Sequence, residues 1–186
     1  MPHILRFMMI VLAVSFGLVP GLQADQNRTV VNSVSTYRLG VGDKIKIQIY
    51  GEPDLDVEAK LTDAGTIVHP LLGEIKAAGL SIGELSAAMM KELKDRYLVD
   101  PKVSVNIVEY RQYYITGEVQ NPGAYHYEPG LTVHKAVSIA GGFTQRASRT
   151  SITLIADKDP TRKPQEVELD TPVNPGDILT IEESFF

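Results

Sequence analysis

The sequence predicts an α+β fold built from two small modules, each a β-sheet covered by one helix. Short segments that favour β-strands recur along the chain and are separated by turns rich in Gly and Pro. Two segments show the helical spacing of apolar residues, one in each half of the chain. The 186 residues are 44% hydrophobic, and a chain of this length buries roughly 70% of its unfolded surface. A folded core is therefore expected.

Charge and composition exclude several classes of function. Lys and Arg number 18 against 23 Asp and Glu, which gives a formal net charge of −5. A nucleic-acid-binding protein needs a clustered basic face to neutralise phosphates, so no nucleic-acid partner is expected. The chain has no cysteine, which rules out disulfides, a thiol nucleophile, a cysteine metal site and a lipid-modified cysteine.

Residues 1–24 have the form of a secretory signal peptide. After a weakly positive start, Phe7–Val19 is an unbroken apolar run, and Ala24 follows a Pro-Gly breaker as the small residue at the cleavage site. Cleavage there makes Asp25 the mature N-terminus, with residues 25–36 as a flexible lead-in. An uncleaved membrane anchor is the alternative, but the apolar run is shorter than the about 20 residues that a membrane span requires.

The first module is expected over residues 37–110. A turn at Gly40–Asp43 leads into a strand at Lys44–Tyr50, where polar and apolar residues alternate so that three isoleucines share one buried face. Further strands are predicted at Val57–Leu61, Thr66–His69, Glu74–Ala77 and Val103–Ile107.

The helix of the first module is predicted from an N-terminal capping box. Ser81 can accept a hydrogen bond at the helix start, and Glu84, three residues later, can bond back to the Ser81 amide. The helix should run to about Tyr97. Its expected buried stripe consists of apolar residues at helical spacing: Ile82, Leu85, Met89, Leu93 and Tyr97.

The second module is expected over residues 111–186 and opens with a hairpin. Tyr113–Val119 is rich in β-branched and aromatic residues and predicts a strand. The turn Asn121-Pro122-Gly123 should be of type II, with positive φ at its glycine, and Ala124–Tyr127 should return as a strand. Glu128-Pro129-Gly130 repeats this turn chemistry.

A short helix and three more strands follow the hairpin. Thr132 is the expected N-cap, and Gly141 and Gly142 should end the helix because glycine adopts the left-handed conformation at low cost. The apolar positions on one helix face are Val133, Ala136, Val137 and Ala140. The strands are predicted at Ser151–Ala156, Val167–Leu169 and Ile178–Glu182.

The pairs Gly42-Asp43 and Gly176-Asp177 each turn directly into a strand with alternating apolar residues. The same device is therefore expected near the start and the end of the fold. We interpret the two aspartates as turn residues whose carboxylates bond to nearby amides, not as an acid/base pair. The predicted structural positions are Gly42, Asp43, Gly65, Pro70, Gly73, Gly117, Pro122, Gly123, Gly141, Gly142, Gly176 and Asp177.

The sequence contains no recognisable catalytic or metal-binding motif. The four histidines lack a zinc-ligand spacing, and no nucleophile elbow, phosphate-binding loop or dinucleotide fingerprint is present. Asp157, Asp159 and Glu168 match three positions of a calcium loop. However, Pro160 lies inside that loop and Arg162 occupies the position that requires glycine. We therefore predict no metal, no cofactor and no enzymatic activity.

Tyrosines cluster on the predicted hairpin. Strand alternation places Tyr113 and Tyr114 on opposite faces, so they cannot both lie in the core. Aromatic rings with a polar tip suit sugar faces, and they also suit half-buried sheets and subunit interfaces. The candidates for glycan or interface contact are Tyr113, Tyr114, Tyr125 and Tyr127. Packing in the core or an interface is the preferred interpretation over direct glycan contact.

Several segments, in order, resemble a known family. Three resemble the polysaccharide biosynthesis/export domain of Wza-like exporters: YRLGVGDKIKIQIYGEPDL, TDAGTIVHPLLGEIKAAGLSIGEL and LVDPKVSVNIVEY. Two resemble the soluble-ligand-binding β-grasp (SLBB) domain that follows it in that family: ITGEVQNPGAYHYEPGLTVHKAVSIAGGFTQRAS and the final NPGDILTIEE. The resemblance covers nearly all of residues 37–184.

The resemblance implies a non-enzymatic periplasmic protein, associated with the outer membrane, that forms rings and conducts or gates capsular or exopolysaccharide. Its implied partners are copies of itself, the polysaccharide and an inner-membrane polysaccharide co-polymerase. The lipidated cysteine usual in the family is absent, and Ala64 replaces the acidic residue before the Gly of the family's Asp-Gly turn. The chain stops soon after its last strand, as in short members that work with a separate outer-membrane β-barrel. The alternative is a soluble periplasmic glycan-binding module that forms no channel.

Overall fold

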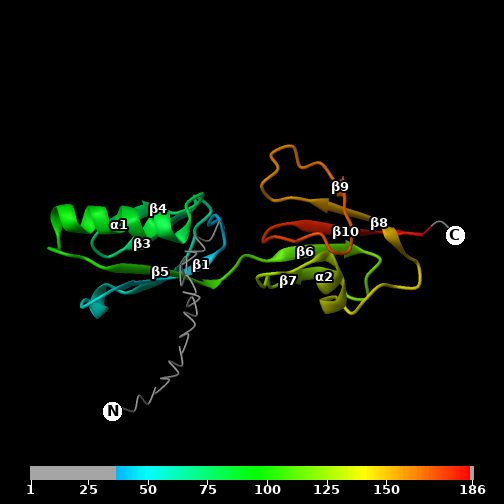
Figure 1. Ribbon diagram of the computed structural model, residues 1–186, viewed down its shortest axis with the longest axis horizontal. Helices are drawn as coiled ribbons and strands as arrows, with labels where there is room; N and C mark the ends of the chain where they lie inside the picture. Colours follow the sequence, from blue (N-terminus) through cyan, green and yellow to red (C-terminus); the bar gives the residue numbers. More distant parts are fainter. Residues whose placement is uncertain (1–36, 185–186) are drawn as a thin grey trace, which may run out of the picture. The chain divides into compact units, whose positions relative to one another are not determined.

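The computed structural model describes residues 37–184, and these fall within one unit of tertiary contacts. The predicted signal peptide and lead-in, residues 1–36, lie outside the described residues, as do residues 185–186. Within 37–184, sheets and helices occur together in each half, which confirms the predicted α+β class (Figure 1). No helix within residues 37–184 has the length and apolar character of a membrane span.

The first module is organised around β1 (Lys44–Ile49) as the central strand of its sheet. This strand pairs antiparallel with β2 (Val57–Lys60) on one side and with β5 (Val103–Glu109) on the other. Its alternate residues are buried as predicted: Ile45, Ile47 and Ile49. A one-turn 3-10 helix, η1 (Pro53–Leu55), lies in the loop expected between β1 and β2.

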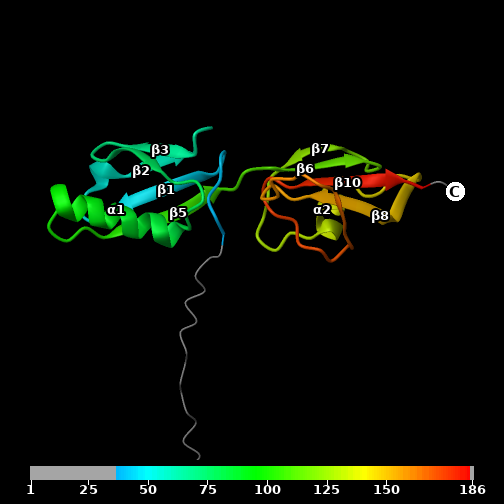
Figure 2. The ribbon, with the colours of Figure 1, turned by 90° about the horizontal axis from the view of Figure 1, so that it is seen from above.

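A hairpin and a helix complete the first module. The hairpin joins β3 (Thr66–His69) to β4 (Gly73–Lys76), and Pro70 lies in the turn between them. The helix α1 (Ile82–Arg96) packs against β5 (Figures 1 and 2). The core beneath α1 consists of Leu39, Ile45, Ile47, Leu61, Ile67, Ala77, Leu85, Met89 and Val105.

The start of α1 is as predicted, but the end of its buried stripe is not. The Ser81 Oγ accepts from the Glu84 amide at 3.2 Å, and the Glu84 carboxylate accepts from the Ser81 amide at 2.8 Å, which confirms the capping box. Tyr97, expected in the stripe, is 48% exposed. The reason is local: the helix ends at Arg96, and Tyr97 takes a non-helical φ of −129° at the C-cap. Its side chain therefore does not continue the buried face.

The second module is a mixed five-stranded sheet with one helix, the predicted β-grasp arrangement (Figure 1). Its sheet order is β7-β6-β10-β8-β9; β6 and β10 are parallel and the other neighbours antiparallel. The strands are β6 (Tyr113–Gly117), β7 (Gly123–Tyr125), β8 (Ala147–Ile155), β9 (Gln165–Glu166) and β10 (Ile178–Glu183). The helix α2 (Val133–Ile139) contributes Val133, Ala136 and Val137 to the core of the module.

The helix α2 is capped and ended as predicted. Thr132 Oγ1 accepts from the Lys135 amide, and the predicted apolar face of the helix, including Ala140, is buried. Positive φ angles occur at both glycines that end α2 and at all the other predicted structural glycines except Gly123: Gly42, Gly65, Gly73, Gly117, Gly141, Gly142 and Gly176.

The predicted type II turn at Asn121-Pro122-Gly123 is wrong. Gly123 does not have a positive φ; it is the first residue of β7 and pairs with Ile115. The chain instead leaves β6 at Gly117, whose φ is +80°, so the reversal is spread over several residues. The second turn is as predicted: Gly130 has φ +82°, and the Leu131 amide bonds to the Glu128 carbonyl at 3.1 Å.

Two strand boundaries of the second module also differ from the prediction. The strand expected to begin at Ser151 begins at Ala147, because Ala147 pairs with Glu183 beyond a register shift whose extra residues lie in β8. The strand expected at Val167–Leu169 lies at Gln165–Glu166. The Leu169 carbonyl instead accepts from an amide in the first turn of α2, so it is not available for a sheet.

His69 is a buried histidine that the sequence analysis did not single out. It is 1% exposed, and its Nδ1 accepts from the Leu71 and Leu72 amides at 3.3 and 3.4 Å. Burial lowers the pKa of His69, and the backbone of Leu55 offsets part of that effect. The folded protein therefore keeps this imidazole neutral at a pH where the unfolded chain already takes up a proton.

We expect acid to destabilise the fold through His69. Because the unfolded chain binds more protons, the contribution of His69 is present above pH about 6.5 and is lost as the pH falls below it, at up to about 1.4 kcal/mol per pH unit. Urea unfolding of the wild type and of His69→Asn at pH 7.5, 6.5 and 5.5 checks this. The wild type should lose more stability over that range than the variant, and parallel losses would contradict the assignment.

Candidate functional site

Asp43 and Asp177 occupy equivalent places, each immediately before a strand that pairs on both sides. The two residues are 0% and 2% exposed, respectively. The Asp43 Oδ2 accepts from the Gly40 amide at 2.8 Å, and the Asp177 Oδ2 accepts from the Asn174 amide at 2.7 Å. In both turns the donor lies three residues before the aspartate. The interpretation of both aspartates as turn residues bonded to nearby amides is confirmed.

The second oxygen of each carboxylate bonds to a residue distant in the sequence. The Asp43 Oδ1 accepts from the Arg111 amide at 2.8 Å, just beyond β5, the antiparallel neighbour of β1. The Asp177 Oδ1 accepts from the Asp157 amide at 3.0 Å, just beyond β8, the antiparallel neighbour of β10. Each carboxylate thus accepts a hydrogen bond from a backbone amide just past the end of the neighbouring strand, where that amide has no partner strand to bond to. The weak Gly-Asp repeat in the sequence is therefore a structural repeat.

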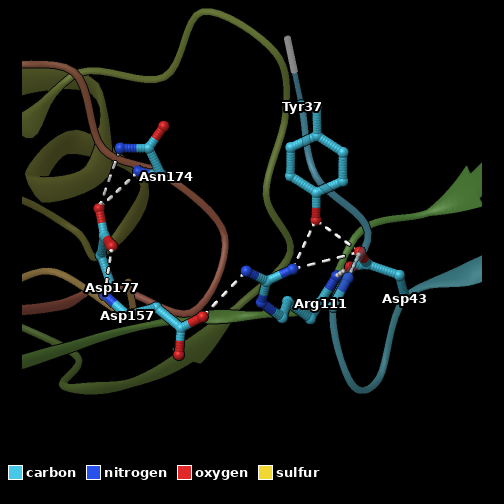
Figure 3. Close-up of polar contacts among 7 residues, drawn as sticks. Tyr37, Asp43, Arg111, Asp157, Asn174 and Asp177 are labelled. Carbon is cyan, nitrogen blue, oxygen red and sulfur yellow. Dashed lines mark hydrogen bonds and ion pairs between the residues drawn. The ribbon is translucent and has the colours of Figure 1, made fainter. Parts of the chain in front are cut away.

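The Arg111 guanidinium joins the first Gly-Asp turn to Asp157, whose backbone amide bonds to the second turn (Figure 3). Its Nη1 donates to the Tyr37 hydroxyl at 2.7 Å and to the Asp43 Oδ2 at 3.2 Å. Its Nη2 donates to the Asp157 carboxylate at 2.9 Å. The Tyr37 hydroxyl in turn donates to the Asp43 Oδ2 at 2.6 Å. The Asp43 side chain is fully buried, that of Arg111 is 13% exposed and that of Asp157 is 33% exposed.

The charge states of Tyr37 and Arg111 are fixed near neutral pH. Burial raises the pKa of Tyr37 and its hydrogen bond to Asp43 raises it further, so the phenol remains a neutral donor. Burial alone lowers the pKa of Arg111, but Tyr37, Asp43 and Asp157 outweigh this effect and the net pKa is raised. Neither the phenol nor the guanidinium titrates near neutral pH, so neither can exchange protons with a substrate there. The arrangement suits a structural cross-link, not general acid/base chemistry.

The four tyrosines predicted as glycan or interface candidates have different surroundings. Tyr113 is fully buried and its ring stacks on Tyr125 with 5.9 Å between centroids; the Tyr125 hydroxyl bonds to a backbone carbonyl. The Tyr127 ring packs edge-on against Tyr110 at 5.2 Å. Tyr114, on the opposite face from Tyr113 as alternation predicts, is 46% exposed. Of the four, Tyr114 presents the most open ring.

Tyr114 lines a polar groove beside Arg111. The groove has a volume of about 480 Å³, within the range of about 300–1,000 Å³ that is usual for ligand sites. Its charged and aromatic lining residues are Lys60, Glu109, Tyr110, Arg111, Tyr114, Asp157 and Arg162. Both Gly-Asp turns contribute backbone to it, through Gly42 and Gly176.

The sequence analysis did not identify Arg111, Tyr37 and Asp157 as members of one cluster. Asp157 and Asp159 match positions of a calcium loop in the sequence, but Asp157 bonds to Arg111, and Asp159 accepts from the Thr161 amide at 2.8 Å. Among residues 37–184, no group of three or more His, Cys, Asp or Glu side chains is placed to hold a metal ion. The repeated Gly-Asp turn was the available signal, because a buried carboxylate has more acceptor capacity than its own turn can use.

Comparison with protein families matches both halves of the chain. Residues 31–108 match the model described as polysaccharide biosynthesis/export protein, and residues 112–165 match the SLBB domain. The chain belongs to the polysaccharide biosynthesis/export family. In this export-family protein, Arg111 lies between the two matched segments, at the point where the export domain passes into the SLBB domain.

Three relatives of this export-family protein carry names that refer to polysaccharides. The exopolysaccharide production protein ExoF of Rhizobium meliloti is 34% identical over 122 residues, 57% of this chain and 28% of the relative. The polysialic acid transport protein KpsD of Escherichia coli is 31% identical over 120 residues, 62% of this chain and 21% of the relative. EpsA of Ralstonia solanacearum, an EPS I polysaccharide export outer membrane protein, is 27% identical over 157 residues, 67% of this chain and 41% of the relative. The chain thus spans less than half the length of these relatives.

Proposed function

We propose that this protein is a non-enzymatic component of the machinery that exports a capsular or exopolysaccharide across the cell envelope. The observation that carries the proposal is the order of its two domains, an export domain followed by an SLBB domain, over most of the described residues. The names of the relatives ExoF, KpsD and EpsA support the same process. The fixed charge states of Tyr37 and Arg111 favour a structural role over a catalytic one.

We further propose that the protein works outside the cytoplasm, in association with the outer membrane, as a ring of identical subunits. A long polar polymer needs a wide hydrated path, and closed cyclic symmetry builds such a path from small subunits. Its partners would be an inner-membrane polysaccharide co-polymerase and a separate outer-membrane β-barrel. The words "outer membrane" in the name of EpsA support an association with the outer membrane.

Deletion of the gene tests the export role. We expect surface and secreted polysaccharide to fall to background in the deletion strain, with the polymer retained inside the cell, and to return when the wild-type gene is supplied. Quantifying acid-hydrolysed sugars from washed cells, medium and lysate separates export from synthesis. An unchanged amount of surface polysaccharide in the deletion strain would refute the proposal.

The oligomeric state distinguishes the ring from its alternative, a soluble glycan-binding module that forms no channel. The polar groove with its exposed tyrosine favours this alternative, because it resembles a binding site within one subunit. Native mass spectrometry of the full chain, alone and with its membrane partners, should give one closed species of several subunits. A strict monomer in the presence of all partners would favour the binding module.

A further inference from the structure

The side chains that line the groove beside Arg111 include three cations and two carboxylates: Lys60, Arg111, Arg162, Glu109 and Asp157. Arg111 is ion-paired with both Asp43 and Asp157. Lys60 and Arg162, in contrast, line the groove and form no ion pair with any residue of the described part of the chain. Of the two carboxylates that line the groove, Asp157 is bonded to Arg111, so Glu109 alone remains to balance Lys60 and Arg162. The groove is therefore suited to a ligand with negative charge.

The backbone at Arg162 is strained and held in place. Its φ of +50° makes Arg162 the one non-glycine residue with positive φ within residues 37–184. The Arg162 amide bonds to the Asp159 carbonyl at 3.1 Å, and the Asp159 carboxylate accepts from the Thr161 and Lys163 amides. Strained positions of this kind concentrate at ligand-binding sites, where the surrounding structure imposes them. The loop thus holds the backbone of Arg162 in a defined conformation beside the groove.

Tyr114 and Gln112 add the features that a sugar requires. The Tyr114 ring is 46% exposed and lines the groove together with the exposed Gln112. An aromatic ring with a polar tip can pack against the apolar face of a pyranose while its hydroxyl stays hydrated. An amide and a carboxylate, such as those of Gln112 and Asp157, can exchange paired hydrogen bonds with sugar hydroxyls.

We propose that this groove binds an acidic sugar unit, of the uronic acid class, in the polysaccharide that the protein helps to export. Lys60 and Arg162 bind the sugar carboxylate through charge-assisted hydrogen bonds, and the Tyr114 ring packs against the sugar ring. The inference rests on the proposed export function, because that function supplies the polymer. It goes further by assigning the chemical class of the sugar and the residues that bind it.

Calorimetric titration of the full chain with trigalacturonic acid and with maltotriose tests the site. The two probes have the same number of sugar rings and differ in their carboxylates and in the configuration at C4. We expect trigalacturonic acid to bind and maltotriose to bind at least about tenfold more weakly, with the difference shrinking in 0.5 M NaCl because salt screens the charges. Tyr114→Ala, and separately Lys60→Gln combined with Arg162→Gln, should each weaken trigalacturonic acid binding about tenfold or more.

Matched variants control for general effects of losing a tyrosine or a cation. Tyr50 is 84% exposed and Lys102 lies close to its ring, and neither lines the groove. Tyr50→Ala and Lys102→Gln should leave binding unchanged. Equal losses in these controls, equal affinity for maltotriose, or no binding of either probe would overturn the site. Displacement of the trisaccharide by millimolar sulfate would also overturn it, because the groove would then be a simple anion site.

Supplying the groove variants to the deletion strain separates this inference from the export role. If Tyr114→Ala and the double variant restore export of an acidic polysaccharide to wild-type levels, the groove assignment is wrong and the export function stands. If the deletion itself leaves export unchanged, the export function is wrong. Loss of export in the variants but not in Tyr50→Ala supports both.

Discussion

Asp43→Ala is expected to lower the free energy of unfolding by about 3–5 kcal/mol, as is usual when one partner of a buried ion pair is removed. The Asp43 carboxylate accepts from the amides of Gly40 and Arg111, the Tyr37 hydroxyl and the Arg111 guanidinium. Alanine cannot accept any of these bonds, and the side chain is fully buried, so water cannot replace it without rearrangement. Urea unfolding followed by circular dichroism measures the loss.

Asp177→Ala provides a matched control within the same chain. Asp177 accepts from two backbone amides in the same geometry and from the Asn174 side chain, but within residues 37–184 it accepts no hydrogen bond from an arginine or a tyrosine. Its loss should cost less, about 1–3 kcal/mol. In a double-mutant cycle, Asp43→Ala and Arg111→Gln should cost less together than the sum of the single changes, because they remove the same contact. Additive losses would show that Arg111 does not stabilise the turn.

The sequence predicted the elements of the fold better than it predicted the site, for a physical reason. The alternation of Ile45, Ile47 and Ile49 and the capping box at Ser81 each act over a few neighbouring residues, and both occur in the structure as predicted. The incorrect prediction of a turn at Gly123 also rested on a local pattern. Its Pro-Gly chemistry permits a type II turn, but pairing of Gly123 with Ile115 in the sheet determined the conformation.

The residues of the site come together only through tertiary structure. The hydrogen bond between Tyr37 and Arg111 joins residues that are 74 positions apart in the sequence. Asp43 and Asp157 are likewise distant from Arg111 in the sequence. No local pattern marks a partner at that distance. The Gly-Asp repeat identified two ends of the cluster, and the exposure of Tyr114 followed from strand alternation. The position of Arg162 at the groove depends on a strained loop that the sequence suggested only as a charged, Pro-containing connection.

Gly117→Ala is the second substitution with a large expected effect. Gly117 ends β6, where φ is +80°, and an added Cβ would lie 2.1 Å from the carbonyl oxygen of Ile181 in the neighbouring strand β10. That oxygen also accepts from the Glu118 amide at 2.9 Å. A methyl group therefore forces apart the parallel strands β6 and β10 at the centre of the sheet. We expect the free energy of unfolding to fall by more than about 3 kcal/mol, because losses of this size arise when a substitution disrupts backbone packing or strand pairing.

Gly130→Ala separates the steric conflict from the conformational cost in this prediction. Gly130 has nearly the same φ, +82°, but an added Cβ there meets no atom within 4 Å. Its substitution should cost only the penalty for alanine in the left-handed region, about 1–2 kcal/mol. Urea unfolding of the two variants gives this comparison: if their m-values are equal, the difference between their midpoints reports the difference in the free energy of unfolding. If both variants lose the same stability, the contact between Gly117 and Ile181 does not constrain the sheet. A larger loss for Gly117→Ala means that the spacing of β6 and β10 requires a residue without a side chain.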